Sequence, residues 1–243
     1  EICHIGAISK KDRPFLDEMQ KAGVALDNVA FLETPSGHAI VMVDEKTGEY
    51  QIILSPSANY NIEQEQIRIA LQKANSSDWA LAQNETCLIE DFLSQAKTKG
   101  LKICYSAAPF VAEQTSALIS ITDLLIVNEG EAESLSEFIK KDITKLALPH
   151  LIITLGSKGA RYVGEQGSFS IAPFDVNVVD TTGAGDTFLG YVLANLTKGK
   201  PMREAMHIAA AAAALQITRR GAMRAIPDSQ EVELFLGNIS KGR

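Results

Sequence analysis

The stretch Val178-Val-Asp-Thr-Thr-Gly-Ala-Gly-Asp-Thr-Phe188 decides how this chain is interpreted. An apolar strand is expected to end at Asp180, and a turn with Gly183 and Gly185 then leads into a helix. Because glycine has no Cβ, backbone N–H groups can crowd around an anion there, and the helix start adds unpaired N–H donors and partial positive charge. Asp186 would repel a phosphate that was merely held, but it suits the removal of a hydroxyl proton beside a transferring phosphoryl group. The plainer alternative is a helix-start carboxylate after a tight turn.

Polar residues also follow two other predicted strands. Thr154-Leu-Gly-Ser-Lys-Gly159 carries a hydroxyl and a cation between glycines, and Val127-Asn-Glu-Gly-Glu-Ala-Glu133 brings an amide and carboxylates to a helix start. Open α/β sheets bind ligands at the carboxyl ends of their strands, and Mg²⁺ prefers oxygen ligands. A β-turn with a solvated lysine and a simple helix cap are the alternatives. Taken with the glycine turn, these strand ends predict a site for nucleotide phosphates.

The wider pattern alternates helical and strand-like segments, which predicts an α/β fold with a mostly parallel sheet. Residues 37–54 break this alternation with two β-type runs joined by Asp44-Glu-Lys-Thr-Gly48, so we expect a hairpin that forms a lid or an edge. Strands are expected within residues 1–6, 79–82, 102–105, 123–127, 151–154 and 169–179. Helices are expected at residues 10–22, 62–74, 88–99, 116–120, 131–138, 184–196, 203–217 and 229–236, and the alanines at 209–214 are expected to form a close-packed helix face.

Composition excludes several classes of protein. The 243 residues are 46% hydrophobic and 22% charged, as in ordinary globular chains, and one domain is expected. A net charge of −7 argues against binding to nucleic acid or an anionic membrane, and no apolar run is long enough for a membrane span. The cysteines Cys3, Cys87 and Cys104 fit buried free thiols in a reducing cytoplasm. The chain contains neither a Walker-type P-loop nor a dinucleotide-binding fingerprint.

The segment Asp180-Thr-Thr-Gly-Ala-Gly-Asp186 resembles the C-terminal signature of the ribokinase-like (PfkB) carbohydrate kinases. Segments at residues 106–109, 127–133, 154–159 and 217–222 resemble family segments in the same order, with the ribokinases nearest. The resemblance implies a three-layer α/β fold with a mostly parallel central sheet. It also implies a small β lid at about residues 31–56, which covers the sugar and can build a homodimer contact.

The resemblance further implies an ATP-dependent kinase that phosphorylates a hydroxymethyl group of a small sugar, with D-ribose the first choice. Asp186 would be the general base, and the anion hole would consist of Gly183, Ala184 and Gly185. ATP would be contacted by Asn128, Thr154, Gly156, Ser157, Lys158 and Gly159, the sugar by Glu85 and Asp186, and Mg²⁺ by Glu131. K⁺ would be held, mostly through backbone oxygens, by Asp180, Thr182, Gln216, Arg219, Gly221 and Ala225.

This chain also departs from the family pattern. Ala225 stands where a serine is often found, and Ala210 where ribokinases carry a histidine beside the adenine. Family members begin with a strand, a sugar-binding Asp and a Gly-Gly-x-x-x-Asn segment, none of which precedes Glu1. We therefore expect a partial version of a longer polypeptide, with weak or no activity in this form. Alternative functions are a kinase for fructose, ketodeoxygluconate or a nucleoside, or a non-catalytic binder of sugar or nucleotide. A dinucleotide-dependent oxidoreductase is disfavoured by the missing fingerprint.

Overall fold

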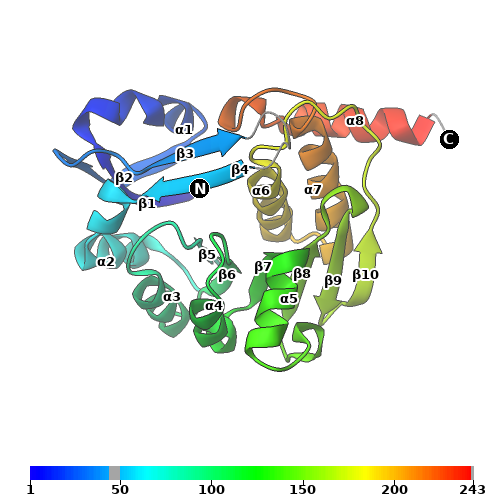
Figure 1. Cartoon of the computed structure of the whole chain (residues 1–243), viewed down its shortest axis with the longest axis horizontal. Coiled ribbons are helices and arrows are strands. Elements are labelled where there is room, and N and C mark those ends of the chain that lie inside the picture. The colour runs from blue at the N-terminus through cyan, green and yellow to red at the C-terminus, as the bar shows by residue number, and fades with distance from the viewer. Residues whose placement is uncertain (44–49, 242–243) are drawn as a thin grey trace. The chain divides into compact units, whose positions relative to one another are not determined.

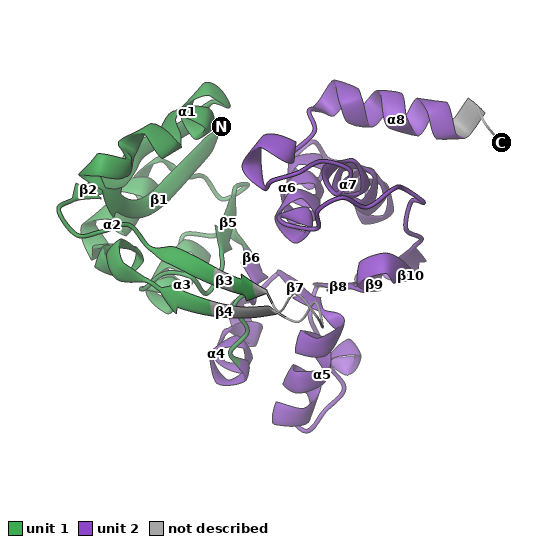
Figure 2. Ribbon diagram, turned by 45° about the horizontal axis from the view of Figure 1, so that its top comes forward, with its two compact units in different colours: residues 1–103, 108–111 green, residues 104–107, 112–243 purple. Residues whose placement is uncertain are grey.

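The computed structural model describes residues 1–43 and 50–241. The chain divides into two compact units (Figure 2), the first made of Glu1–Ile103 with Ala108–Val111 and the second of Cys104–Ala107 with Ala112–Arg243. The predicted α/β organisation is confirmed by a six-stranded sheet with the order β10-β9-β8-β7-β6-β5. Its strands are β5 (Trp79–Ala82), β6 (Lys102–Ser106), β7 (Leu124–Asn128), β8 (His150–Thr154), β9 (Ala160–Gly164) and β10 (Gly167–Ile171).

The centre of this sheet is parallel and buried. β6 pairs with β7, and β7 with β8, in parallel register. Four consecutive apolar residues of β7, Leu124 to Val127, are buried, which is the pattern of a parallel strand that is covered on both faces. The helix α5 (Glu129–Phe138) follows directly and packs against β7 and β8 (Figure 1). The carboxyl ends of β7 and β8 therefore lie side by side.

Two of the strand predictions need correction. β9 was not foreseen, and β8, β9 and β10 form an antiparallel meander. Residues 172–181 form no strand, so the prediction of a strand ending at Asp180 is wrong. Pro173 has no N–H for a ladder, and the N–H groups of Val179 and Asp180 both donate to the Ile217 carbonyl instead. The segment reaches the glycine turn as an extended strap tied to residue 217.

The second unit contains several further helices named by the sequence pattern. α6 and α7 pack against each other, and Ala209, Ala211 and Ala212 of α7 are fully buried, which confirms the close-packed alanine face. Val232 of α8 joins the cluster formed by Ala211 and Ala212. The bounds are α4 (Ala112–Leu118), α6 (Ala184–Thr197), α7 (Met202–Gln216) and α8 (Ser229–Lys241).

The first unit opens with a parallel pair of strands, β1 (Ile2–Ser9) and β2 (Val24–Leu32). The helix predicted at 10–22 is mostly a 3-10 helix, Lys10–Leu16, followed by the short α1 (Asp17–Lys21). Pro14 lies inside the 3-10 segment and removes a donor that an α-helix would use. β2 was missed by the sequence pattern. This unit also contains a 3-10 helix, Ser57–Asn61, and the α-helices α2 (Gln64–Lys73) and α3 (Ile89–Thr98).

The two β-type runs of the predicted hairpin pair in antiparallel register as β3 (His38–Val43) and β4 (Tyr50–Ser55). The joining residues 44–49 lie outside the described residues. Apolar side chains on this pair are exposed, including Ile40, Ile53 and Leu54. The assignment of residues 31–56 as a lid stays a prediction.

The cysteines differ from the prediction of buried thiols. Cys104 is buried and Cys87 partly so, but Cys3 is exposed, because the first residues of β1, Ile2 to His4, are all uncovered. Burial raises the pKa of the Cys104 thiol well above its usual range. Separately, among the described helices none combines the length and the apolar character needed to cross a bilayer.

Candidate active site

The glycine turn strongly favours glycine at its centre. Gly183 is the residue before α6 and has φ +76°, a left-handed conformation that side chains disfavour. A Cβ at this position would also lie 3.1 Å from Nε2 of Gln216 and 3.5 Å from Ala222. Conformation and packing both therefore account for Gly183.

Gly185 differs, because neither reason applies to it. It lies in the first turn of α6 with no left-handed φ, and a Cβ placed there would meet no described atom within 4 Å outside its chain neighbours and the backbone of α6. Glycine inside a helix costs about 1 kcal/mol relative to alanine. Neither packing nor backbone conformation requires glycine at position 185. The absence of a side chain there leaves room for a ligand to approach the backbone.

The start of α6 combines this space with N–H donors and a carboxylate. The N-cap is a glycine and supplies no side-chain oxygen, while the N–H of Thr187 donates to the Gly183 carbonyl at 2.9 Å. The first turn of a helix leaves N–H groups without helical partners, and Gly185 and Asp186 belong to that turn. The Asp186 side chain is exposed. An anion docked here would meet backbone donors with a potential proton acceptor beside them.

Asp180 fastens the strap that leads into the turn. Its Oδ1 accepts hydrogen bonds from the backbone N–H of Thr182 at 3.0 Å and from the Thr182 hydroxyl at 2.7 Å, and its Oδ2 accepts from the Gly221 N–H at 2.9 Å. These bonds, led by that of the Thr182 hydroxyl, lower the pKa of Asp180 to about 2. The ionised carboxylate thus ties the strap to the loop after α7.

The other residues predicted to hold K⁺ lie in that loop or just before it. Gln216 is fully buried, with hydrogen bonds to Thr182, Thr187 and Ala222. The Arg219 guanidinium binds both carboxylate oxygens of Glu231 in α8, at 2.6 and 3.2 Å, and Ala225 is buried. Within residues 1–43 and 50–241, no three His, Cys, Asp or Glu side chains gather in a way that could hold a metal ion.

At the end of β7, Asn128 and Glu131 form a reciprocal capping box. The Asn128 Oδ1 accepts from the Glu131 N–H at 2.9 Å, and Glu131 Oε2 accepts from the Asn128 N–H at 2.7 Å. Burial raises the pKa of Glu131, and the Asn128 hydrogen bond opposes that rise. The plainer alternative from the sequence, a helix cap, is therefore realised in the structure, and one oxygen of Glu131 is already used.

The loop after β8 lies beside this cap. Asn128 and Thr154 are partners in the β7–β8 register, and Lys158 forms an ion pair with Glu129 at 2.9 Å. Gly159 has φ +92°, and a Cβ there would lie 2.1 Å from the Ile171 carbonyl oxygen, so no other residue fits. Gly156 also has a positive φ, and Ser157 is exposed between them. The structure thus brings together the polar residues that follow β7 and β8.

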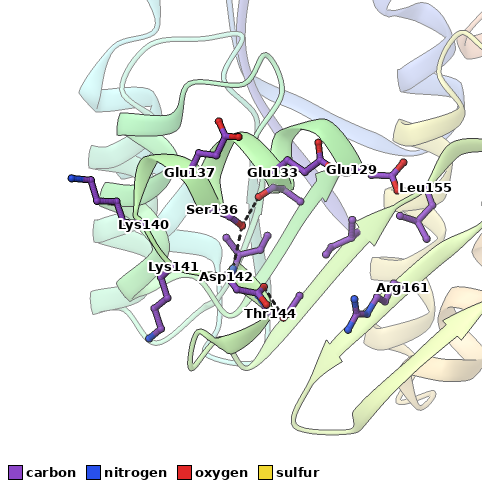
Figure 3. Close-up of a pocket in the computed structure, with 13 residues that line it drawn as sticks. Glu129, Glu133, Ser136, Glu137, Lys140, Lys141, Asp142, Thr144, Leu155 and Arg161 are labelled. Atoms are coloured by element: carbon purple, nitrogen blue, oxygen red, sulfur yellow. Dashed lines mark hydrogen bonds between the residues drawn. The ribbon is translucent and has the colours of Figure 1, made fainter.

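A surface hollow of about 650 Å³ lies alongside α5 (Figure 3). Glu129 and Leu155 reach its rim, so it borders the predicted ATP-binding loop. Some of its polar groups bond to one another: Ser136 donates to the Ala132 carbonyl, and Asp142 accepts from Thr144. The hollow does not include the glycine turn, and neither Asp186 nor any anion-hole residue lines it.

Glu85 belongs to the first unit, between β5 and α3. Its side chain is exposed, and its backbone oxygen accepts from the Asn59 amide at 3.2 Å. Its role with a sugar stays a prediction.

Sequence reasoning missed two side-chain roles. It treated Gln216 only as a source of a backbone oxygen, although the side chain joins three segments, and it did not pair Glu129 with Lys158. The signal for Gln216 was available, since it is the polar residue that ends an otherwise apolar stretch at 208–215. The ion pair had no comparable signal, because it depends on the parallel neighbours β7 and β8.

Comparison with known proteins places these features in context. The model of the family described as pfkB family carbohydrate kinase matches residues 4–229. The ribokinase of Schizosaccharomyces pombe is 31% identical over 234 residues, which cover 90% of this chain and 73% of that protein. The crystal structure of ribokinase from Thermotoga maritima matches with a TM-score of 0.82 and 32% identity, over 97% of this chain and 81% of that one. Arabidopsis thaliana ribokinase, solved in complex with ribose and ATP, matches with a TM-score of 0.80 and 25% identity, over 96% and 81%.

Proposed function

Since the chain belongs to the pfkB family of carbohydrate kinases, we propose that it transfers the γ-phosphoryl group of ATP to the hydroxymethyl group of D-ribose. The choice of ribose is supported by the ribokinases among its relatives, one of which was solved with ribose and ATP. The observation that carries the proposal is the start of α6, where Asp186 follows a glycine that has room above its Cα.

The proposed reaction assigns a role to each part of the turn. Asp186 accepts the proton of the ribose hydroxymethyl group as its oxygen attacks the γ-phosphorus. The bond from that phosphorus to the bridging oxygen breaks, and ADP leaves with the electron pair. The N–H groups of Gly183, Ala184 and Gly185 stabilise the charge on the transferring oxygens, that of Ala184 in exchange for the Thr181 carbonyl to which it donates at 3.2 Å. Positioning and electrostatics supply most of the catalysis in such reactions.

We place the nucleotide at the paired ends of β7 and β8. Their register and the Lys158–Glu129 ion pair support a common surface formed by Asn128 and the 154–159 loop. Gly159 keeps this loop close to β10, and the exposed Ser157 and Lys158 present a hydroxyl and a cation. A lysine here would pair with a phosphate oxygen in exchange for its present carboxylate partner.

Two cations belong to the proposal. Mg²⁺, when bound, would neutralise charge on the phosphate oxygens. Glu131 would face such an ion with its second oxygen, directly or through a water molecule, because the first accepts the Asn128 N–H. For K⁺ the neutral backbone oxygens of residues 180–182 and 216–225 fit, since Asp180 and Gln216 hold these two segments side by side. The one anionic side chain among these residues, Asp180, already accepts hydrogen bonds from Thr182 and Gly221.

The assay that tests the function measures ADP release in the presence of ATP and Mg²⁺, with the protein at its full encoded length. Ribose, fructose, ketodeoxygluconate and a nucleoside are supplied in parallel, and K⁺ is varied at constant ionic strength. We expect ribose to give the highest kcat/KM. Preference for another sugar would reassign the substrate, and binding of sugar and ATP by calorimetry without turnover would replace the kinase by a non-catalytic binder.

We also propose that β3 and β4 act as a lid over the sugar and as a homodimer contact. The exposed apolar residues Ile40 and Ile53, which are partners in the β3–β4 register, support this, because contiguous apolar surface favours association. Sedimentation of the protein and of an Ile53→Lys variant would test it, with a shift from dimer to monomer expected. A cytoplasmic location stays a prediction from the cysteine usage.

A further inference from the structure

The Gln216 side chain is a buried amide that touches both ends of the glycine turn. It lies at the last residue of α7 with none of its surface exposed. Its Nε2 donates to the Thr182 carbonyl at 3.0 Å and to the Ala222 carbonyl at 2.9 Å. Its Oε1 accepts from the Thr187 hydroxyl at 3.0 Å. Thr182 precedes Gly183, and Thr187 lies one turn into α6.

These bonds hold the side chain in one orientation. A carboxamide has two N–H donors on one atom and an acceptor on the other, and here both donors and the acceptor have partners. A reversed amide would set oxygen against two carbonyl oxygens. Because a buried polar group without a partner loses its full solvation, the amide and the three segments that it joins resist moving apart.

The amide also sets the position of the turn itself. Its Nε2 lies 3.1 Å from where a Cβ of Gly183 would be, so the amide packs directly against the Gly183 backbone. The turn is thus clamped before Gly183, at Gly183 and after it. A shift of the amide would tilt the N–H groups at the start of α6, and catalysis by such donors is sensitive to small displacements.

We propose that Gln216 is a positioning residue that fixes the anion-hole turn through its side-chain amide. The same amide donates to the Thr182 oxygen, one of the oxygens expected to bind K⁺, so it holds the turn even without the cation. This inference rests on the proposed function for its effect on catalysis, but its effect on the order of the turn can be measured independently.

The first test replaces Gln216 by methionine, which keeps the volume and removes the hydrogen bonds. The matched control is Asn195→Leu. Asn195 is also a buried amide in this unit, but it donates to the Tyr191 carbonyl within its own helix α6 and does not reach the turn. In hydrogen exchange, Gln216→Met is expected to speed exchange at residues 181–187 and 219–225 by about tenfold or more. Asn195→Leu should leave those residues unchanged.

In the ADP-release assay, Gln216→Met should lower kcat by about tenfold to a hundredfold with little change in the KM for sugar. Asn195→Leu should keep the wild-type kcat. Equal exchange at 181–187 in the two variants would overturn the clamp, whatever the activity. Faster exchange with an unchanged kcat would overturn the catalytic part, and a wild-type protein without kinase activity would refute the proposed function alone. If Gln216→Met does not fold, Thr187→Val removes one bond of the same set and is expected to show a smaller effect in the same residues.

The second test addresses the cation. Gln216→Glu keeps the shape of the side chain but places a carboxylate oxygen against the Thr182 and Ala222 carbonyl oxygens. A bound cation would reduce the repulsion between these oxygens. Thermal unfolding is measured in KCl and in choline chloride at equal ionic strength. The variant is expected to gain about 3 °C in KCl over choline chloride, and the wild-type protein distinctly less. A wild-type gain as large as that of the variant would show that the amide does not substitute for the cation.

Discussion

The starts of α5 and α6 differ in how their N–H groups are used. At α5, Asn128 and Glu131 cap each other, so the helix closes its own end. At α6, the N-cap is Gly183, and the chain supplies a turn held from outside by Gln216 and Asp180. A helix end that is capped by its own side chains gains stability. An end that is left open, with its backbone held in place, gains the capacity to bind an anion.

The largest effect is expected from Asp186→Asn, which tests whether the start of α6, unlike that of α5, takes part in catalysis. If the start of α6 is the catalytic end, loss of the base should lower kcat by about 10²–10⁴-fold, while the affinity for ATP stays close to that of the wild type. ADP-release kinetics and calorimetry with a non-hydrolysable ATP analogue provide the two measurements. Asp142→Asn, which removes a carboxylate that caps a short 3-10 helix in the same unit, is the control. A mild effect of Asp186→Asn would remove that residue from its role.

Gly185→Ala separates stability from function at the open end. A Cβ here meets no described atom, so the helix should gain up to about 1 kcal/mol of stability. The same methyl group would occupy the space proposed for the phosphoryl group, and kcat/KM for ATP should fall by about tenfold or more. Denaturant unfolding and steady-state kinetics measure the two effects.

Gly190→Ala is the matched control for this prediction. Gly190 lies in the same helix, and its Cβ would also have open space among the described atoms. It should show the gain in stability without the loss of activity. Equal activity of the two variants would mean that no ligand approaches Gly185.

A change at Asn128 tests whether the capped start of α5 only stabilises the fold or also contacts ATP. Asn128→Ala should cost about 1 kcal/mol in the free energy of unfolding, because the cap is lost. Asn128→Asp keeps an oxygen acceptor for the Glu131 N–H and should retain the stability. If Asn128 also contacts ATP as we propose, the KM for ATP rises in both variants. A KM that is unchanged in both would leave α5 as a purely structural helix start.

The smallest expected effect is on the pH dependence of stability, through Asp180 in the extended strap. The folded pKa of Asp180, about 2, lies below its ordinary value of 3.8. The unfolded state therefore binds the proton more readily, so this contribution to stability is full above about pH 4 and is lost as the pH falls toward 2. Asp180→Asn should flatten the decline of Tm in that window relative to the wild type. A parallel decline in the two proteins would contradict the hydrogen bonds assigned to this carboxylate.

Local sequence signals predicted the regular elements of the second unit well. The apolar run of β7 and the alanines of α7 carry their burial in their composition, because a strand covered on both faces and a close helix contact each demand particular residue types. The same signals failed at residues 172–181. There the valines favoured a strand, but Pro173 and the bonds to the Ile217 carbonyl override that propensity. Strand propensity depends on a residue and its neighbours in the sequence. Strand pairing also depends on which segment lies next to it in the folded chain.

By itself, the sequence established the α/β fold class, the glycine turn at the start of α6, and the family, since these depend on residue types at short spacing. The tertiary structure decided which helix start is closed and which is open, and that Gln216 holds the turn from the last residue of the next helix, α7. It also paired Lys158 with Glu129. Hydrogen bonds and ion pairs between distant segments depend on the three-dimensional position of both partners, and no local pattern of residues encodes that position.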